Sequence, residues 1–119
     1  MVKRILFCGS RDWDQPGTIR EVIQGMVQDR GRFTVVHGGA RGADTMAGAA
    51  AKHLGLLVEE YPAQWNSFGK RAGYLRNKQM ADTNPELVVA FQKDGSRGTQ
   101  LMLGIAEKRG IPHTIYYPH

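Results

Sequence analysis

The stretch VVHGGARGADTMAG, residues 35–48, determines the fold that we predict for this chain. An apolar run leads into three glycines and an arginine, and a helix-forming segment rich in alanine follows. A buried strand that turns sharply into a helix is the building unit of parallel α/β sheets. A loop that only turns the chain needs one glycine, so three glycines with an arginine indicate that something lies against this loop.

Other short runs rich in Val, Ile, Leu, Phe and Tyr, bounded by turn residues, are also predicted to be strands. Together with residues 34–37, the predicted strands are residues 4–8, 57–61, 87–91 and 113–117. Apart from residues 57–61, which contain Glu59 and Glu60, the runs are mostly apolar rather than alternating. Such runs are typical of a parallel sheet that is covered on both faces.

Helical patterns lie between these strands. The first begins near Pro16, with Asp14 as a possible N-cap, and repeats apolar residues at spacings of three and four as far as Val27. The others cover residues 44–54, 73–81 and 99–109. This order predicts a single α/β domain, residues 1–119, with a Rossmann-like doubly wound sheet of about five mainly parallel strands and helices on both faces.

The bulk composition fits a single small intracellular domain. The chain has 119 residues, of which 41% are hydrophobic, and it has no apolar run near the length of a membrane span, so we expect a soluble, cytoplasmic protein. Cys8 is the one cysteine and the histidines are scattered, so we expect no disulfide, metal site or cofactor. The net charge of +5 favours anionic partners.

Ligands of doubly wound sheets bind at the carboxyl ends of the strands. The loops expected there read CGSRDW, HGGARGAD and QKDGSRGTQ, and each has glycine before an arginine, namely Arg11, Arg41 and Arg97. Helix N-termini and arginine forks both bind phosphate, so we predict a phosphate-bearing ligand. For any one loop, glycines that merely permit a turn and a solvated arginine are an equally good interpretation. The spacing matches neither G-x-G-x-x-G nor a P-loop.

The third predicted helix and the loop before it add candidates. Arg76 and Met80 share a helical face, so a core-facing Met80 would draw Arg76 toward the sheet edge, where it needs a partner. That partner is a ligand anion, Asp82, Glu86 or a backbone carbonyl. Trp65 and Lys70 lie in a long loop that suits a base-stacking cover over a nucleotide, although Trp65 could equally pack in the core.

These motifs resemble those of the SLOG superfamily, a Rossmann-like group that contains the Lonely-guy nucleosidases and the DNA processing protein A core. The similarity is greatest to the small bacterial and phage branch related to YspA. It rests on FCGSRDW, VVHGGARGAD, YPAQW followed by GKRAGYLRNKQMA, and VVAFQKDGSRGT, which cover nearly the whole chain in family order. The resemblance implies a nucleotide or nucleotide-derived ligand, and a homodimer or higher homo-oligomer.

The resemblance also exposes a departure. The nucleosidases have Arg-Lys-x-x-Met and Gly-Gly-x-Gly-Thr-x-x-Glu segments. Here Arg76 and Met80 match the first segment, Asn77 replaces its lysine, and Met102 stands where the second has its catalytic glutamate. A thioether is neither an acid nor a base, so N-glycosidic cleavage would need a substitute such as Asp12 or another acid of the rim loops, Asp44 or Asp94.

Three functions follow from these observations. The first is a module that binds a nucleotide as a sensor or a sequestering protein. The second is a nucleoside 5'-monophosphate phosphoribohydrolase with Arg76 as a catalytic residue, and the third is a nucleic-acid binding domain. The residues predicted to bind the ligand are Gly9, Ser10, Arg11, Asp12, Gly38, Gly39, Ala40, Arg41, Gly42, Asp44, Trp65, Lys70, Arg76, Asn77, Gly95, Ser96, Arg97, Gly98 and Thr99.

Overall fold

The computed structural model describes residues 2–119 and contains one parallel sheet of five strands in the order β3-β2-β1-β4-β5. The strands are β1 (Arg4–Gly9), β2 (Thr34–His37), β3 (Val58–Glu60), β4 (Leu87–Phe91) and β5 (His113–Tyr116). The helices are α1 (Pro16–Arg30), α2 (Ala43–His53), the short α3 (Trp65–Phe68), the 3-10 turn η1 (Gly69–Arg71), α4 (Ala72–Ala81) and α5 (Arg97–Lys108).

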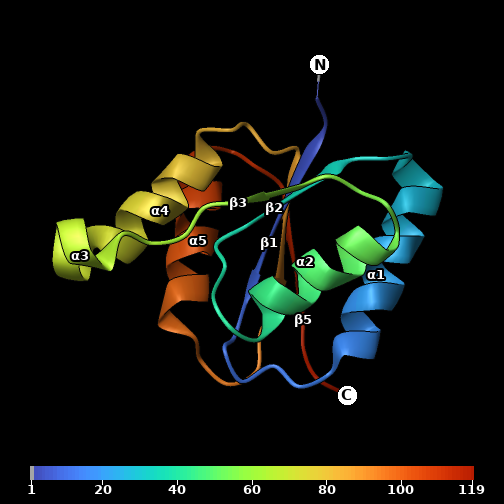
Figure 1. Cartoon of the computed structure of the whole chain (residues 1–119), viewed down its shortest axis with the longest axis horizontal. Coiled ribbons are helices and arrows are strands. Elements are labelled where there is room, and N and C mark those ends of the chain that lie inside the picture. The colour runs from blue at the N-terminus through green and yellow to red at the C-terminus, as the bar shows by residue number, and fades with distance from the viewer. Residues whose placement is uncertain (1) are drawn as a thin grey trace.

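The strand order makes the sheet doubly wound. From β1 the chain moves outward through β2 to β3, and it then returns to β4 on the other side of β1. Figure 1 shows the sheet nearly edge-on, with α1 and α2 on one side and α4 and α5 on the other. The predicted Rossmann-like sheet with helices on both faces is therefore confirmed, and strand order reverses between β1 and β4.

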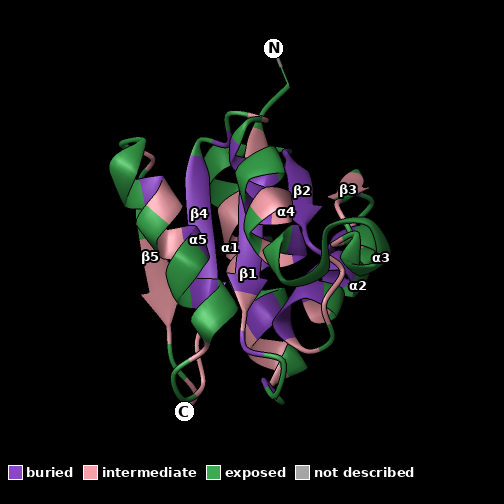
Figure 2. Cartoon of the chain, turned by 90° about the vertical axis from the view of Figure 1, so that its left-hand side faces the viewer, coloured by how far each residue is buried: buried purple, intermediate pink, exposed green. Residues whose placement is uncertain are grey.

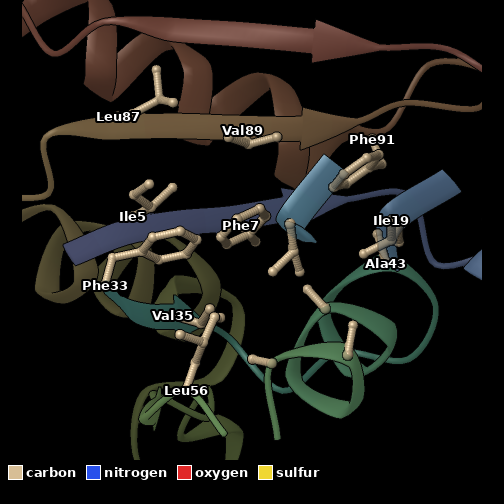
Figure 3. Packing of buried hydrophobic residues seen from close by; sticks show 14 of the residues in the cluster. Ile5, Phe7, Ile19, Phe33, Val35, Ala43, Leu56, Leu87, Val89 and Phe91 are labelled. Atoms are coloured by element: carbon tan, nitrogen blue, oxygen red, sulfur yellow. The ribbon is translucent and has the colours of Figure 1, made fainter. Parts of the chain in front are cut away.

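Both faces of the central strands are buried, because successive side chains of a strand point to opposite faces. Ile5 and Phe7 of β1 join one cluster under α1 and α2, and the Phe7 ring stacks on Phe91 with centroids 6.4 Å apart (Figure 3). Leu6 and Cys8 join a second cluster under α4 and α5. This double burial explains why the strands read as apolar runs.

Two local predictions were wrong. Asp14 does not cap α1, because the N-cap residue is Gln15 and it makes no side-chain capping bond; the Asp14 carboxylate instead lies 3.3 Å from Nζ of Lys93. The segment expected to be a long loop contains α3 and η1, which project away from the sheet in Figure 1. Among residues 2–119, no helix combines the length and apolarity needed to span a membrane.

Candidate functional site

A crevice of about 380 Å³ lies at the switch point, where β1 and β4 end side by side. Its walls come from the loops that follow these two strands, from the start of α2 and from α4. This is the edge of the sheet predicted to hold the ligand, at the bottom of Figure 1. Its volume falls within the range of about 300–1,000 Å³ that is usual for small-molecule sites.

The crevice brings together most of the residues that the sequence singled out. Those lining it are Gly9, Ser10, Arg11, Asp12, Ala40, Asp44, Arg76, Asn77, Gly95, Ser96, Arg97, Gly98 and Thr99. The structure places the other predicted residues outside its lining, and these are Gly38, Gly39, Arg41, Gly42, Trp65 and Lys70.

Ser10 fastens the loop after β1 to the loop after β4. Its buried hydroxyl donates a 2.8 Å bond to the backbone oxygen of Lys93 and accepts a 2.9 Å bond from the backbone nitrogen of the same residue. Trp13 anchors the far end of the first loop, with its buried ring 5.3 Å from the Phe91 ring. The exposed Arg11 and Asp12 are thereby held at the mouth of the crevice.

The glycines of the opening stretch are explained by close approaches within the protein. A Cβ on Gly38 would collide with the guanidinium of Arg76, and one on Gly42 would collide with the backbone oxygens of Ser10 and Arg11. Gly39 and Gly42 also have positive φ angles of 74° and 82°, which favour glycine. The loop therefore has three glycines because other parts of the chain pack against its backbone.

Asp44 holds this loop from the first turn of α2. Its Oδ2 atom accepts hydrogen bonds from the backbone nitrogens of Gly38 at 3.0 Å and Ala40 at 3.4 Å. Burial raises the pKa of this carboxyl to about 6, although the nearby positive charge of Arg76 and the two hydrogen bonds oppose the shift. Asp44 is thus a buried acid that titrates near neutral pH and borders the crevice.

Arg76 and Asn77 connect α4 to the loop after β2 and to the start of α5. Arg76 donates through Nη1 to the backbone oxygen of Gly38 at 2.6 Å and through Nε to Oδ1 of Asn77 at 2.9 Å. The Asn77 amide donates in turn to the backbone oxygen of Gly98 at 3.4 Å. Burial lowers the pKa of Arg76, and the charge of Asp44 partly restores it. Among the partners considered for Arg76, the structure shows the backbone carbonyl.

The N-terminus of α5 forms another part of the crevice wall. Ser96 is its N-cap, and the Ser96 hydroxyl oxygen accepts bonds from the backbone nitrogen of Thr99 at 3.4 Å and from its hydroxyl at 2.9 Å. Asp94 has a φ of 55°, which turns the chain sharply before the helix. Helix N-termini attract anions because their first amides have no partner within the helix.

Met102 lies in the hydrophobic core rather than in the crevice lining. Its side chain is fully buried in the cluster with Leu6, Met80 and Val88. Met102 is therefore an apolar side chain that supports the sheet, and it brings no acid to the crevice.

The structure places the segment predicted to cover the crevice outside the crevice lining. Trp65 and Phe68 are each 50% exposed, and neither they nor Lys70 border the crevice. The Trp65 ring lies against Gly73 of α4, so it also does not join the core. All three arginines of the glycine loops are exposed, but Arg11 and Arg97 line the crevice and Arg41 does not.

Sequence reasoning left four lining residues out of the predicted site: Cys8, Met80, Lys93 and Asp94. Lys93 and Asp94 stand in the third glycine and arginine loop, so their place after a strand was the available signal. His37 was missed as a loop support: its Nδ1 accepts a 3.0 Å bond from the Gly39 backbone, and burial lowers its pKa. Among residues 2–119, no group of three or more His, Cys, Asp and Glu side chains could hold a metal.

Two solved structures share this fold. DNA processing protein A from Streptococcus pneumoniae superposes with a TM-score of 0.77 at 19% identity, over 99% of this chain and 51% of that chain. MurG from Acinetobacter baumannii superposes with a TM-score of 0.62 at 13% identity, over 97% of this chain and 35% of that one. This chain thus spans about half of the first protein and about a third of the second, and at such identities the likeness is one of fold.

Sequence comparison gives a narrower relationship. The Gene 61 protein of Mycobacterium phage D29 is 34% identical in an alignment of 117 positions, and the match covers 93% of this chain and 94% of the phage protein. The model of the YspA, cpYpsA-related SLOG family matches residues 3–68, more than half of the chain. That range includes β1, α2 and the loop of residues 38–42 between β2 and α2, here called the glycine loop. The chain belongs to the YspA, cpYpsA-related SLOG family.

Proposed function

We propose that this protein binds a nucleotide or a nucleotide-derived small molecule in the crevice and acts as a sensor or a sequestering module. The observation that carries the proposal is the gathering of basic side chains from separate elements around one concave site at the switch point. They are Arg11 after β1, Arg76 on α4, Lys93 after β4 and Arg97 at the start of α5. Cations around a concave site concentrate anions, and arginine matches the geometry of phosphate.

The crevice walls contain groups that bind a phosphate and groups that accept hydrogen bonds from a ligand. The start of α5, with Arg97 and Thr99, supplies a helix N-terminus beside a cation, which suits a phosphate group. Asp12 and Asp94 line the same cavity and are acceptors for hydroxyl or amino groups. A ligand that has both an anionic group and hydrogen-bond donors, such as a nucleotide, matches this mixture.

Asp44 supports a second candidate function, N-glycosidic cleavage of a nucleoside monophosphate. An acid with a pKa of about 6 that borders a crevice has the protonation behaviour required of a general acid. However, its Oδ2 atom already accepts two backbone bonds that hold the glycine loop. Met102, at the position of the nucleosidases' glutamate, is buried in the core. Binding without turnover is therefore the leading proposal.

Native mass spectrometry of the purified protein with a nucleotide panel separates the two candidates. The panel contains adenine and guanine mononucleotides, ADP-ribose and cyclic dinucleotides, and the products are analysed for free base. We expect at least one intact nucleotide to be retained, with no free base or ribose 5-phosphate. Release of free base that Asp44→Asn abolishes would replace the binding proposal with the hydrolase, and retention of no panel member would count against both.

A further inference from the structure

A second cavity lies in the groove between α4 and α5. It has a volume of about 450 Å³, which exceeds the 380 Å³ of the crevice. Its apolar surface comes from Tyr74 on α4 and from Leu101 and Ile105 on α5. Tyr74 and Leu101 are 49% and 48% exposed, and both line this cavity, so they form one exposed apolar surface across the two helices. Figure 2 shows these two helices side by side on the face toward the viewer.

Gly104 keeps the groove open. It lies on α5 between Leu101 and Ile105, and a Cβ built on it has no neighbouring atom within 4 Å. The glycine is therefore not required by any contact within the protein. Alanine at this position would stabilise the helix and would fit without a clash. The glycine therefore leaves open a space that a side chain could have filled.

The rim of the groove is basic. Its charged lining residues are Lys78 of α4, Arg97 and Lys108 of α5, and Arg109, with no aspartate or glutamate among them. Within residues 2–119, Arg109 has an ion pair, at 2.7 Å to Asp82, whereas none is formed by the other three. An apolar floor beneath a basic rim favours a ligand with an apolar face and acidic flanks.

We propose that this groove binds an acidic amphipathic helix of a partner protein. The groove follows α5 from Arg97 to Lys108, a rise of about 16 Å, which matches roughly three turns of a bound helix. Helices bind such grooves through apolar anchors spaced at three, four and seven residues. Leu101 and Ile105 would contact those anchors, and Lys78 and Lys108 would pair with flanking acids.

Other occupants match the groove less well. Nucleic acid would pair with the rim but would leave Leu101 and Ile105 facing its charged backbone. In a second copy of this chain, the longest helix of residues 2–119, α1, offers no acidic face, since it balances Arg20 and Arg30 with Glu21 and Asp29. The inference does not rest on the nucleotide proposal, although Arg97 borders both cavities, and so Arg97 is left unchanged in the test.

Selection from a displayed library of random 16-residue peptides tests this inference with the full chain as bait. We expect enriched peptides to have apolar residues at helical spacing with Asp or Glu beside them. Synthetic peptides with the enriched sequences should bind the Gly104→Leu variant at least about tenfold more weakly than the wild-type protein, because leucine fills the groove. The control variant Gly104→Ala should change the affinity by less than about twofold. Should Gly104→Leu fail to fold by circular dichroism, Lys78→Glu, an exposed charge reversal, provides the same test.

Several results would overturn the inference. They are a library without enrichment, enriched peptides without acidic residues, and equal affinity for the wild-type protein and the groove variants. A dimer in sedimentation equilibrium that Gly104→Leu dissociates would assign the groove to a second copy. Binding of a single-stranded oligonucleotide that Lys78→Glu abolishes would assign it to nucleic acid.

Discussion

The Nη1 atom of Arg76 donates a 2.6 Å hydrogen bond to the backbone oxygen of Gly38, and this bond joins α4 to the glycine loop beside the crevice. The Nε atom of the same side chain binds Asn77, which reaches the start of α5. A guanidinium has five N–H donors, so these two bonds leave donors for an anion. Arg76 therefore both positions the loops and borders the proposed ligand site.

Substituting Gly38 tests this contact. A methyl group at Gly38→Ala would collide with the Arg76 guanidinium, so the arginine must move away and lose its carbonyl partner. We expect the free energy of unfolding to fall by about 1–3 kcal/mol, measured by urea denaturation. Gly25→Ala is the matched control, because Gly25 lies in α1 with no atom near an added Cβ, and it should stabilise the protein by about 0.5–1 kcal/mol. Equal effects of the two substitutions would contradict this account.

Asp44 should make stability depend on pH. Its folded-state pKa is raised from 3.8 to about 6, so its contribution to stability is complete below pH 4 and is lost as pH rises through 6. We expect Asp44→Asn, which has no titrating carboxyl, to lack this decline. The free energy of unfolding of wild type relative to Asp44→Asn should fall by up to about 3 kcal/mol between pH 4 and pH 7. Parallel pH profiles for the two proteins would show that Asp44 does not titrate in this range.

Removing the Ser10 hydroxyl should loosen the crevice. Ser10→Ala leaves the partly buried backbone nitrogen and oxygen of Lys93 without their partner, so we expect a loss of about 1–3 kcal/mol in the free energy of unfolding. Ser67→Ala is the control, because Ser67 is exposed on α3 and should tolerate alanine. Thermal denaturation of both variants checks the difference, and an unchanged melting temperature for Ser10→Ala would be inconsistent with the fastening role of its hydroxyl.

How far the sequence predicts this structure depends on the range of the interactions. The apolar runs of β1, β2 and β4 have few alternatives to burial, so their positions and the order of the elements were predictable. The partners within the site were not. Ser10 bonds to a residue 83 positions away, and Gly38 meets an arginine 38 positions away. Such approaches are set by the packed sheet and leave no periodic pattern in the sequence.

The helical turns of the segment of residues 65–71 could not be predicted for a different reason. All of its residues are exposed, so it has no apolar stripe from which to recognise a helix. Its single turn is closed by local bonds, such as the 3.0 Å bond from the backbone nitrogen of Phe68 to the oxygen of Gln64. The aromatic and basic residues of this segment resembled a nucleotide cover in the sequence, but the structure places them away from the crevice.

A double substitution tests that placement. Trp65→Ser combined with Phe68→Ser removes both exposed rings, and we expect the affinity for a crevice ligand to change by less than about twofold, because neither ring borders the crevice. Fluorescence or calorimetric titration with a nucleotide that the wild-type protein retains measures this. A large loss of affinity would mean that the segment closes over the ligand, as the sequence alone indicated.

The most direct test of the proposed function is isothermal titration calorimetry of the wild-type protein, Arg11→Ala and Arg41→Ala with the nucleotide panel. The two arginines are both exposed and follow similar glycine loops, but only Arg11 borders the crevice. We expect at least one panel member to bind the wild-type protein, to lose about tenfold or more in affinity with Arg11→Ala, and to be unaffected by Arg41→Ala. Absence of binding by every member, or equal losses in the two variants, would contradict a nucleotide site in this crevice.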